Sequence, residues 1–94
     1  MTEIAVKDEE SYKKDFLPDA RKIIMDHGGK YLGGGFNKTV ALSGAPPANR
    51  IVLLQFENMD TVKAWWDGGG GDIEKKVGSK YATFRTLAIE GVTP

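Results

Sequence analysis

The run "RIVLLQF", residues 50–56, constrains the fold more than any other stretch of this sequence. Side chains alternate between the two faces of a β-strand, so Ile51 and Leu53 lie on one face while Val52 and Leu54 lie on the other. Both faces are therefore largely apolar. A strand with this pattern is central in its sheet and is covered on both sides. We expect a strand over 51–56 with protein packed against each face.

The segments around this strand alternate between strand and helix patterns. They predict strands at 2–7, 30–33, 38–43 and 83–91, with a loose glycine bend between the second and the third. They also predict helices at 9–14, 16–26 and 59–67, and a further short helix capped by Asp72. Asp8, Asp15 and Asn58 each precede a helical pattern with a side-chain oxygen suited to capping. Gly28 is placed to close the helix over 16–26, and "APPAN", residues 45–49, is expected to form a loop.

The order of these elements is strand, helix, strand, strand, helix, strand. This order predicts one α+β domain over residues 1–94 with the ferredoxin-like β-α-β-β-α-β plan, a four-stranded antiparallel sheet with its helices on one face. Such a plan leaves the second face of the sheet bare, although the strand over 51–56 is apolar on both faces. The simplest cover is a second copy of the chain, so we expect a homodimer in which two sheets pack face to face.

Composition excludes several classes of function. The chain has 13 basic and 13 acidic residues, so it has no strong field to attract nucleic acid or anionic lipid. The absence of cysteine excludes disulfides and thiolate chemistry, and a single histidine argues against a transition-metal site. No metal or cofactor is expected. The first ten residues lack an apolar segment of signal-peptide length and no stretch is apolar enough to span a bilayer, so a cytoplasmic protein is expected.

Two glycine runs raise the question of a phosphate-binding loop. In "GGGFNKT" the position that needs glycine before the Lys-Thr pair is occupied by Asn37, so the P-loop motif fails. In "WWDGGGGD" no lysine or hydroxyl follows the glycines over 68–71. Because consecutive glycines disfavour helix, we expect a break there. It is either a flexible connection or a mobile lip beside a pocket, since Trp65 and Trp66 stand directly before it.

Five residues are candidates for a binding or catalytic site. His27 either caps the end of its helix or acts as a general base, because it is the one side chain whose ordinary pKa lies near neutrality. Arg50 either binds a carboxylate or pairs with an acidic residue across the dimer. Arg85 is either a pocket cation or a solvent-facing charge. Tyr12 and Trp66 offer a ligand both an apolar ring and a polar tip.

Four segments of the sequence resemble the domain of unknown function 1330 family: "AVKDEESYKKDF", "HGGKYLGGG", "NRIVLLQFENMDTVKAWW" and "KKVGSKYATFRTLAIEGV". The family belongs to the dimeric α+β barrel superfamily, so the resemblance implies the ferredoxin-like fold and the homodimer. It implies no reaction, because the family has no established activity. The wider superfamily includes cofactor-free monooxygenases, decarboxylases and isomerases that usually hold a ligand between sheet and helices. The family's usual tyrosine near Gly71 is missing here.

The function favoured by these observations is a small-molecule-binding dimer with a pocket between sheet and helices, and with a small apolar or aromatic carboxylate as its ligand. Two alternatives remain open. One is a cofactor-free enzyme of monooxygenase or isomerase type acting on a small carboxylate, which requires His27 to share a cavity with an arginine or a tyrosine. The other is a structural or interaction dimer without a ligand, which requires that no cavity reach ligand size, roughly 300 Å³. Glu9, Glu10 and Asp15 are assigned to helix starts and solvent, so no catalytic carboxylate pair is predicted.

Overall fold

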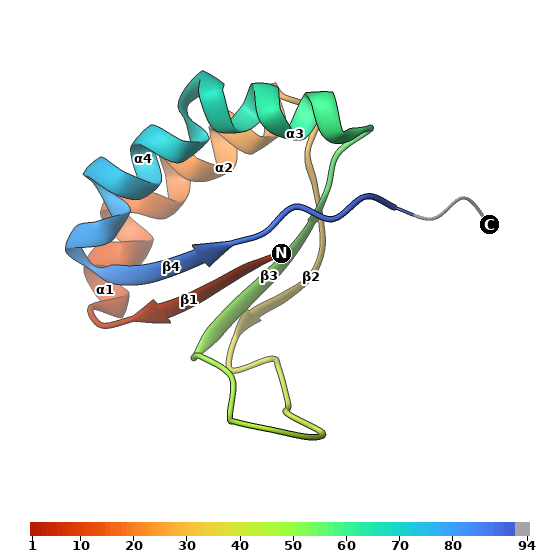
Figure 1. Cartoon of the computed structure of the whole chain (residues 1–94). Helices are drawn as coiled ribbons and strands as arrows, with labels where there is room; N and C mark the ends of the chain where they lie inside the picture. Colours follow the sequence, from red (N-terminus) through yellow and green to blue (C-terminus); the bar gives the residue numbers. More distant parts are fainter. Residues whose placement is uncertain (92–94) are drawn as a thin grey trace.

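A computed structural model describes residues 1–91 of the chain. The elements in order are β1 (Thr2–Val6), α1 (Glu9–Ser11), the π-helical turn η1 (Tyr12–Phe16), α2 (Leu17–Asp26), β2 (Lys30–Phe36), β3 (Arg50–Gln55), α3 (Met59–Trp65), the π-helical segment η2 (Trp66–Gly70), α4 (Gly71–Lys76), the 3₁₀ turn η3 (Gly78–Lys80) and β4 (Ala82–Thr86). The helices form one layer and the strands another (Figure 1).

The strands form a four-stranded antiparallel sheet in the order β2-β3-β1-β4. The helical layer, α2 beside α3 and α4, lies on one face of this sheet (Figure 1). The ferredoxin-like α+β fold is therefore confirmed. Two rows of side chains run across neighbouring strands on the face that the helices cover. Ile4 of β1 lies between Arg50 and Phe84, and Thr2 lies between Val52 and Thr86.

The strand β3 lies inside the sheet, as its sequence pattern predicts, because it pairs with β2 on one side and with β1 on the other. Its two apolar faces have different surroundings. Val52 faces the helices and is 6% exposed, whereas Leu53 faces the open side of the sheet and is 45% exposed. Within residues 1–91, protein therefore covers one of the two apolar faces that the sequence pattern predicts.

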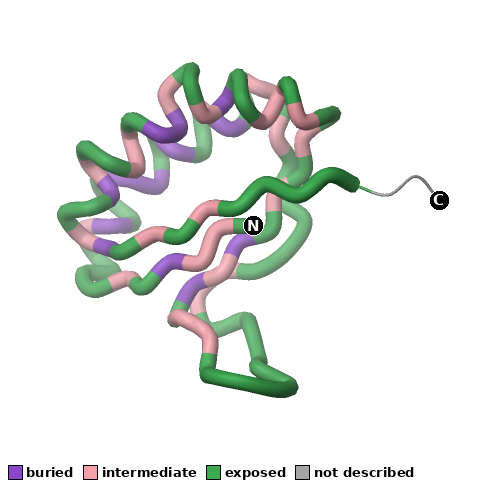
Figure 2. Tube along the Cα trace, in the orientation of Figure 1, coloured by how far each residue is buried: buried purple, intermediate pink, exposed green. Residues whose placement is uncertain are grey.

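The core lies between the sheet and the helices, where the inward sides of both layers are buried (Figure 2). Its buried members are Ile4, Tyr12, Phe16, Leu17, Ala20 and Ala82. Tyr12 stacks on Phe16 with ring centres 5.0 Å apart, and Phe16 packs on Phe84 at 5.3 Å. Such aromatic pairs contribute about 0.5–1.5 kcal/mol beyond the apolar area they bury.

The first helical region differs from the prediction of two helices separated at Asp15. Helical residues run without interruption from Glu9 to Asp26, and the turn at Tyr12–Phe16 is widened to a π-helix in which the Leu17 amide donates to the Tyr12 carbonyl. A wider turn before Pro18 accommodates a residue that lacks an N–H and clashes with the preceding turn. Asp15 is therefore no cap, and its carboxylate instead accepts a hydrogen bond from the Tyr81 hydroxyl at 2.9 Å.

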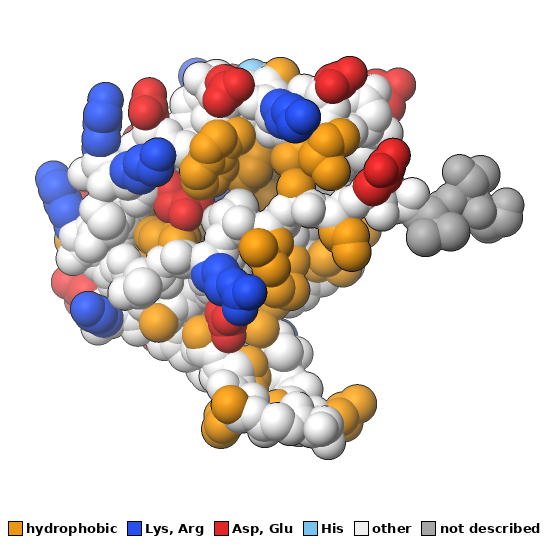
Figure 3. Space-filling model, in the orientation of Figure 1, with side chains coloured by type: hydrophobic (Ala, Val, Ile, Leu, Met, Phe, Trp, Pro, Cys, Tyr) orange, Lys and Arg blue, Asp and Glu red, His pale blue; other side chains and the backbone are white. Residues whose placement is uncertain are grey.

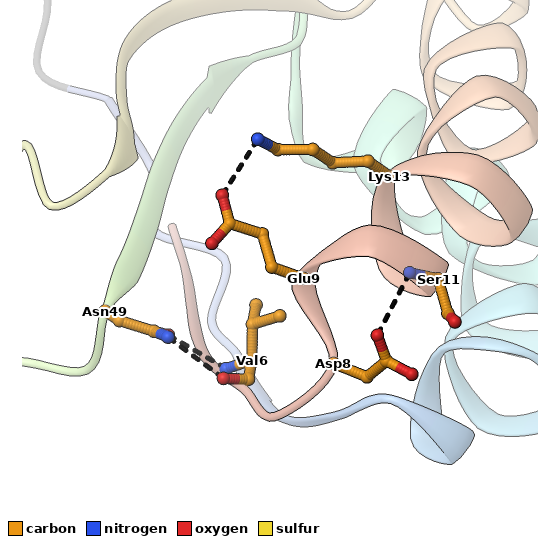
Figure 4. A network of polar contacts seen from close by, with 6 residues as sticks. All are labelled: Val6, Asp8, Glu9, Ser11, Lys13 and Asn49. Atoms are coloured by element: carbon orange, nitrogen blue, oxygen red, sulfur yellow. Dashed lines mark hydrogen bonds and ion pairs between the residues drawn. The ribbon is translucent and has the colours of Figure 1, made fainter.

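Other predicted helix ends are confirmed. Asp8 accepts from the Ser11 amide at 3.1 Å, and Asn58 accepts from the Thr61 amide at 2.9 Å. Gly28 closes α2 with a φ of 76°. Figure 4 shows the Asp8 cap beside a second polar contact, in which Asn49 accepts from the Val6 amide and donates to the Val6 carbonyl. This pair of hydrogen bonds attaches the end of the loop over 37–49 to β1.

The predicted strand at 30–33 is confirmed as the first part of a longer strand, whereas the glycine bend after it and the strand at 38–43 are wrong. A single strand, β2, continues to Phe36 and pairs its glycines with β3. Gly34 has a φ of 99°, and a Cβ there would lie 2.0 Å from the Ile51 carbonyl oxygen, so only glycine allows this close pairing. Residues 37–49 form a loop that projects away from the sheet (Figure 1), and Leu42 within it is 98% exposed.

The glycines over 68–71 break the helical path, as the sequence predicts. The kink lies at Gly68 and Gly69, and Gly69 has a φ of 129°, which disfavours any side chain. The prediction that Asp72 caps the next helix is wrong, because α4 begins one residue earlier and Asp72 lies in its first turn. A Cβ on Gly70 would lie 2.6 Å from the Trp65 ring, so the run also allows close packing.

The last strand, β4, is shorter than the predicted range of 83–91. It begins at Ala82 and ends at Thr86. One pair of hydrogen bonds continues beyond it, in which the Leu87 amide donates to the Met1 carbonyl and the Met1 ammonium group donates to the Leu87 carbonyl, each at 2.9 Å.

Candidate functional site

An interior cavity of about 50 Å³ lies between the sheet and the helices. Most of its lining is apolar, and the polar or charged groups come from five residues on different elements: Thr2, Tyr12, Tyr31, Arg50 and Glu74. A water-sized atom needs roughly 10–15 Å³ of such volume, so the cavity holds about three to five atoms of that size. This volume is far below the 300 Å³ expected for a drug-sized ligand. Only a very small ligand fits.

Arg50 is the single buried charged residue in residues 1–91, with 6% of its surface exposed. It is buried because it shares the helix-facing side of β3 with Val52 and Leu54. Its guanidinium carbon lies 4.7 Å from the centre of the Phe36 ring and 5.7 Å from that of Tyr12. These cation–π contacts compensate part of the cost of burying the charge.

The Arg50 guanidinium has no carboxylate partner. Within residues 1–91 the only ion pair joins Lys13 to Glu9, and the buried Nε of Arg50 has no hydrogen-bond partner. Buried cations in proteins are normally paired, because removing an ion from water costs several kcal/mol. No acidic side chain of residues 1–91 pairs with Arg50, which leaves the two alternatives of a ligand carboxylate and an acidic residue across the dimer. The structure leaves a cation beside an interior cavity.

Two tyrosines line the cavity next to this cation. Burial raises the pKa of Tyr12, an effect that the Arg50 charge opposes and the Glu74 charge reinforces. Burial also raises the pKa of Tyr31, and the Arg21 guanidinium, which lies 6.0 Å from the Tyr31 ring centre, opposes that rise. Both phenols therefore remain protonated at neutral pH, so they can donate a hydrogen bond to a ligand.

Glu74 lines the same cavity from α4, and the sequence analysis missed it. Its carboxylate accepts a hydrogen bond from the Thr86 hydroxyl, with oxygen distances of 3.0 and 3.2 Å. Burial raises the pKa of Glu74, although the Thr86 hydrogen bond and the Lys75 charge oppose this effect. The sequence offers one indication that Glu74 faces inward. It follows Ile73 on a helix that presents Ile73 and Val77 to the core. That signal is weak because glutamates on helices usually face solvent.

Trp66 lies at a neighbouring cavity of about 180 Å³, which Trp65, Asp67 and Thr86 also line. Hydrophobic side chains gather in this gap between the α3–α4 layer and β4 (Figure 3). The indole Nε1 of Trp65 is buried without a hydrogen-bond partner. A larger groove of about 400 Å³ lies under the segment 87–91, beside the start of α3, and none of the five predicted site residues lines it.

His27 and Arg85 line none of these three cavities. The His27 Nδ1 donates to the Ile23 carbonyl at 2.8 Å, which is the helix-capping role that the sequence analysis proposed. A Cβ on Gly68 would lie 2.7 Å from its Nε2, so the ring packs against the glycine kink. Arg85 is exposed on the open face of the sheet, as a solvent-facing charge. Of the five predicted residues, the interior cavity therefore brings together only Tyr12 and Arg50.

Comparison with protein families matches residues 1–92 to the Domain of unknown function (DUF1330). The chain belongs to the DUF1330 family. A search of curated proteins finds no significant match to it. Within residues 1–91, no helix is both long and apolar enough to cross a membrane. In the same part of the chain, no three His, Cys, Asp or Glu side chains come together in a way that could hold a metal ion.

Proposed function

We propose that this DUF1330 protein binds a short carboxylate in its interior cavity, and that it does so as a homodimer. The observation that carries the proposal is the buried Arg50 guanidinium, which has no carboxylate partner within residues 1–91. A ligand carboxylate would compensate the buried charge and form charge-assisted hydrogen bonds with the fork of N–H donors. The apolar walls of the cavity would hold the rest of the ligand.

The size of the cavity narrows the ligand class. A volume of about 50 Å³ favours a short aliphatic acid over the aromatic carboxylate that the sequence also suggests. A ligand this small binds weakly, because affinity is limited to about 1.5 kcal/mol per non-hydrogen atom. We expect a dissociation constant in the micromolar to millimolar range.

No reaction is proposed. The enzyme alternative requires His27 in a cavity with an arginine or a tyrosine, and His27 instead packs against Gly68 with its Nδ1 bonded to Ile23. The interaction dimer without a ligand remains as an outcome of the experiment below, since the cavity between sheet and helices is small enough to be filled by water alone. The groove of about 400 Å³ does reach ligand size, but none of the five predicted site residues lines it.

Titration of the purified protein with propionate, followed by amide NMR shifts, tests the proposal. We expect saturable shifts in residues around β3 and α4. Arg50→Gln should weaken binding at least tenfold, because charge-assisted hydrogen bonds contribute about 1.5–3 kcal/mol. Arg85→Gln removes an exposed arginine from β4 and is the matched control, which should bind as the wild type does. Wild-type protein without saturable shifts would contradict the proposal and favour the interaction dimer.

The homodimer is supported by a row of apolar side chains on the open face of the sheet. By the strand register, Met1 lies between Leu53 and Leu87, and these three side chains are 40%, 45% and 45% exposed. A solvated face of an antiparallel sheet normally carries polar residues at such positions. Exposed apolar patches of this kind are typical of protein interfaces. A second copy packed through a two-fold axis would cover the row with itself.

A further inference from the structure

The interior cavity carries a second charged group that the proposed carboxylate does not use. Glu74 reaches it from α4, and the only hydrogen-bond donor to its carboxylate within residues 1–91 is the Thr86 hydroxyl. A carboxylate has about four lone-pair positions that can accept hydrogen bonds. Acceptor capacity on Glu74 therefore remains free on the cavity side of the helix.

The cation and the carboxylate reach the cavity from different elements. Arg50 lies on β3, whereas Glu74 is held at β4 by Thr86, and β1 separates these strands. Strands two places apart in a sheet are about 10 Å from each other. The nitrogens of Arg50 and the oxygens of Glu74 are more than 4.0 Å apart, so the two charges form no ion pair. Ile4 and Thr2 of β1 form the floor between them.

Charge balance selects the ligand. With Arg50 and Glu74 both ionised, the residues that line the cavity have a net charge of zero. A simple carboxylate would leave one net negative charge in a mostly apolar interior, which is unfavourable. A ligand with its own positive group beside the carboxylate keeps the sum at zero and gives Glu74 a partner. The cavity volume restricts such a ligand to about three to five non-hydrogen atoms.

We propose that the ligand is a short amino acid in its zwitterionic form, with its carboxylate bound by Arg50 and its ammonium group bound by Glu74. This inference rests on the proposed function, because it assigns the second end of the same ligand. Both groups line the cavity together with Tyr12, and both charges act on the pKa of that phenol, which Arg50 lowers and Glu74 raises.

Three probes with the same number of non-hydrogen atoms, glycine, glycolate and propionate, separate the contribution of the ammonium group from that of the carboxylate. Each has the carboxylate, while the second group is an ammonium, a hydroxyl or a methyl group. Calorimetric or NMR titration of the full-length protein with each probe gives the order of affinity. We expect glycine to bind about 10- to 100-fold more tightly than propionate, since a hydrogen bond between charged groups is among the strongest in proteins. Glycolate should fall between them.

Variants test which side chain causes the preference. Glu74→Leu should abolish or reverse the preference for glycine, because the ammonium group would face an apolar side chain. Thr83→Val removes an exposed hydroxyl from the same strand as Thr86 and is the control, so the preference should remain. Far-ultraviolet circular dichroism and urea unfolding show whether each variant is folded. Glu74→Gln, which keeps the size and polarity of the side chain, replaces Glu74→Leu if the leucine variant does not fold.

The outcomes distinguish the two proposals. Binding of all three probes with equal affinity, lost in Arg50→Gln, would overturn the amino-acid inference and leave the carboxylate site intact. Binding of glycolate as tightly as glycine would also overturn it, because a charged group would then have no advantage. Failure of all three probes to bind would overturn both proposals.

Discussion

Arg50 and Glu74 are the two charged residues that line the interior cavity. Each occupies a position on the inward side of its element, Arg50 beside Val52 on β3 and Glu74 beside Ile73 on α4. Their charges are held in an interior that is otherwise apolar and aromatic. A buried charge that lacks an ion-pair partner is costly, and this cost is the basis of the proposed carboxylate site.

Substitution of Glu74 by glutamine tests its environment. Burial raises the pKa of Glu74 in the folded state above its ordinary value, so the folded protein binds a proton more readily than the unfolded chain. The stability contributed by this group is thus fully present below the ordinary glutamate pKa and is lost as the pH rises through the folded value. We expect Glu74→Gln to match the wild type in acid and to exceed its free energy of unfolding at neutral pH.

Urea unfolding at a series of pH values measures this difference. The charged and titratable groups near Glu74 are Lys75 on the same helix, Arg50 on β3 and Tyr12 on η1, and all three are unchanged in the variant. Glu10→Gln removes one negative charge from an exposed position and controls for net charge. A difference between Glu74→Gln and the wild type that stays constant with pH would contradict the prediction.

At the scale of elements, the kink between α3 and α4 determines how the helical layer closes over the sheet. The run over 68–71 combines one glycine whose φ of 129° disfavours a side chain with others that lie against aromatic or imidazole rings. Trp65 and Trp66 pack at 5.7 Å from each other just before this kink, and Trp65 stacks on Phe56 at 5.3 Å. The glycines therefore allow both indole rings to sit close to the backbone of α4.

Substitution of Gly70 by alanine tests this close packing. Its new Cβ would lie 2.6 Å from the Trp65 ring and 3.0 Å from the Trp65 carbonyl oxygen. Overpacking of this kind costs about 1–3 kcal/mol, which exceeds the gain of about 0.8–1 kcal/mol from alanine in a helix. We expect a net loss of up to about 2 kcal/mol in urea unfolding. Gly33→Ala is the control, since no atom lies within 4 Å of its Cβ position, and full stability in Gly70→Ala would refute the packing argument.

At the scale of the whole molecule, the sheet separates a covered face from an open one. The helices bury Ile4 and Val52, while Leu53 and Leu87 on the other face remain 45% exposed. The loop over 37–49 projects beyond the sheet and carries Leu42 into solvent (Figure 1). These features are unusual for an isolated domain and suit a larger assembly.

Leu53→Lys tests the proposed dimer. A lysine at the middle of the open face would place one charge from each copy in the interface, so we expect dissociation to monomers in sedimentation equilibrium. Met25→Lys is the matched control, because Met25 is 69% exposed on the helical layer and its substitution should leave the dimer intact. Wild-type protein that sediments as a monomer at micromolar concentration would disprove the homodimer.

Much of the architecture follows from the sequence alone. The strand pattern of "RIVLLQF", the capping residues Asp8 and Asn58 and the closing Gly28 predict elements that the structure confirms. These signals are reliable because they depend on residues a few positions apart. The prediction was wrong where longer-range contacts decide the outcome. Gly34 pairs with β3 instead of bending the chain, and Pro18 follows a widened turn instead of starting a new helix.

For the candidate site, too, the sequence indicates some residues correctly and fails for others. Local chemistry identified Tyr12 and Arg50 as candidates, but it also selected His27 and Arg85, which lie outside the interior cavity, and it overlooked Glu74. Sequence determined the class of the fold and the apolar character of both faces of β3, because these arise from the period of side chains along one element. Only the tertiary structure decided which charges meet, because a cavity forms where side chains from distant segments converge.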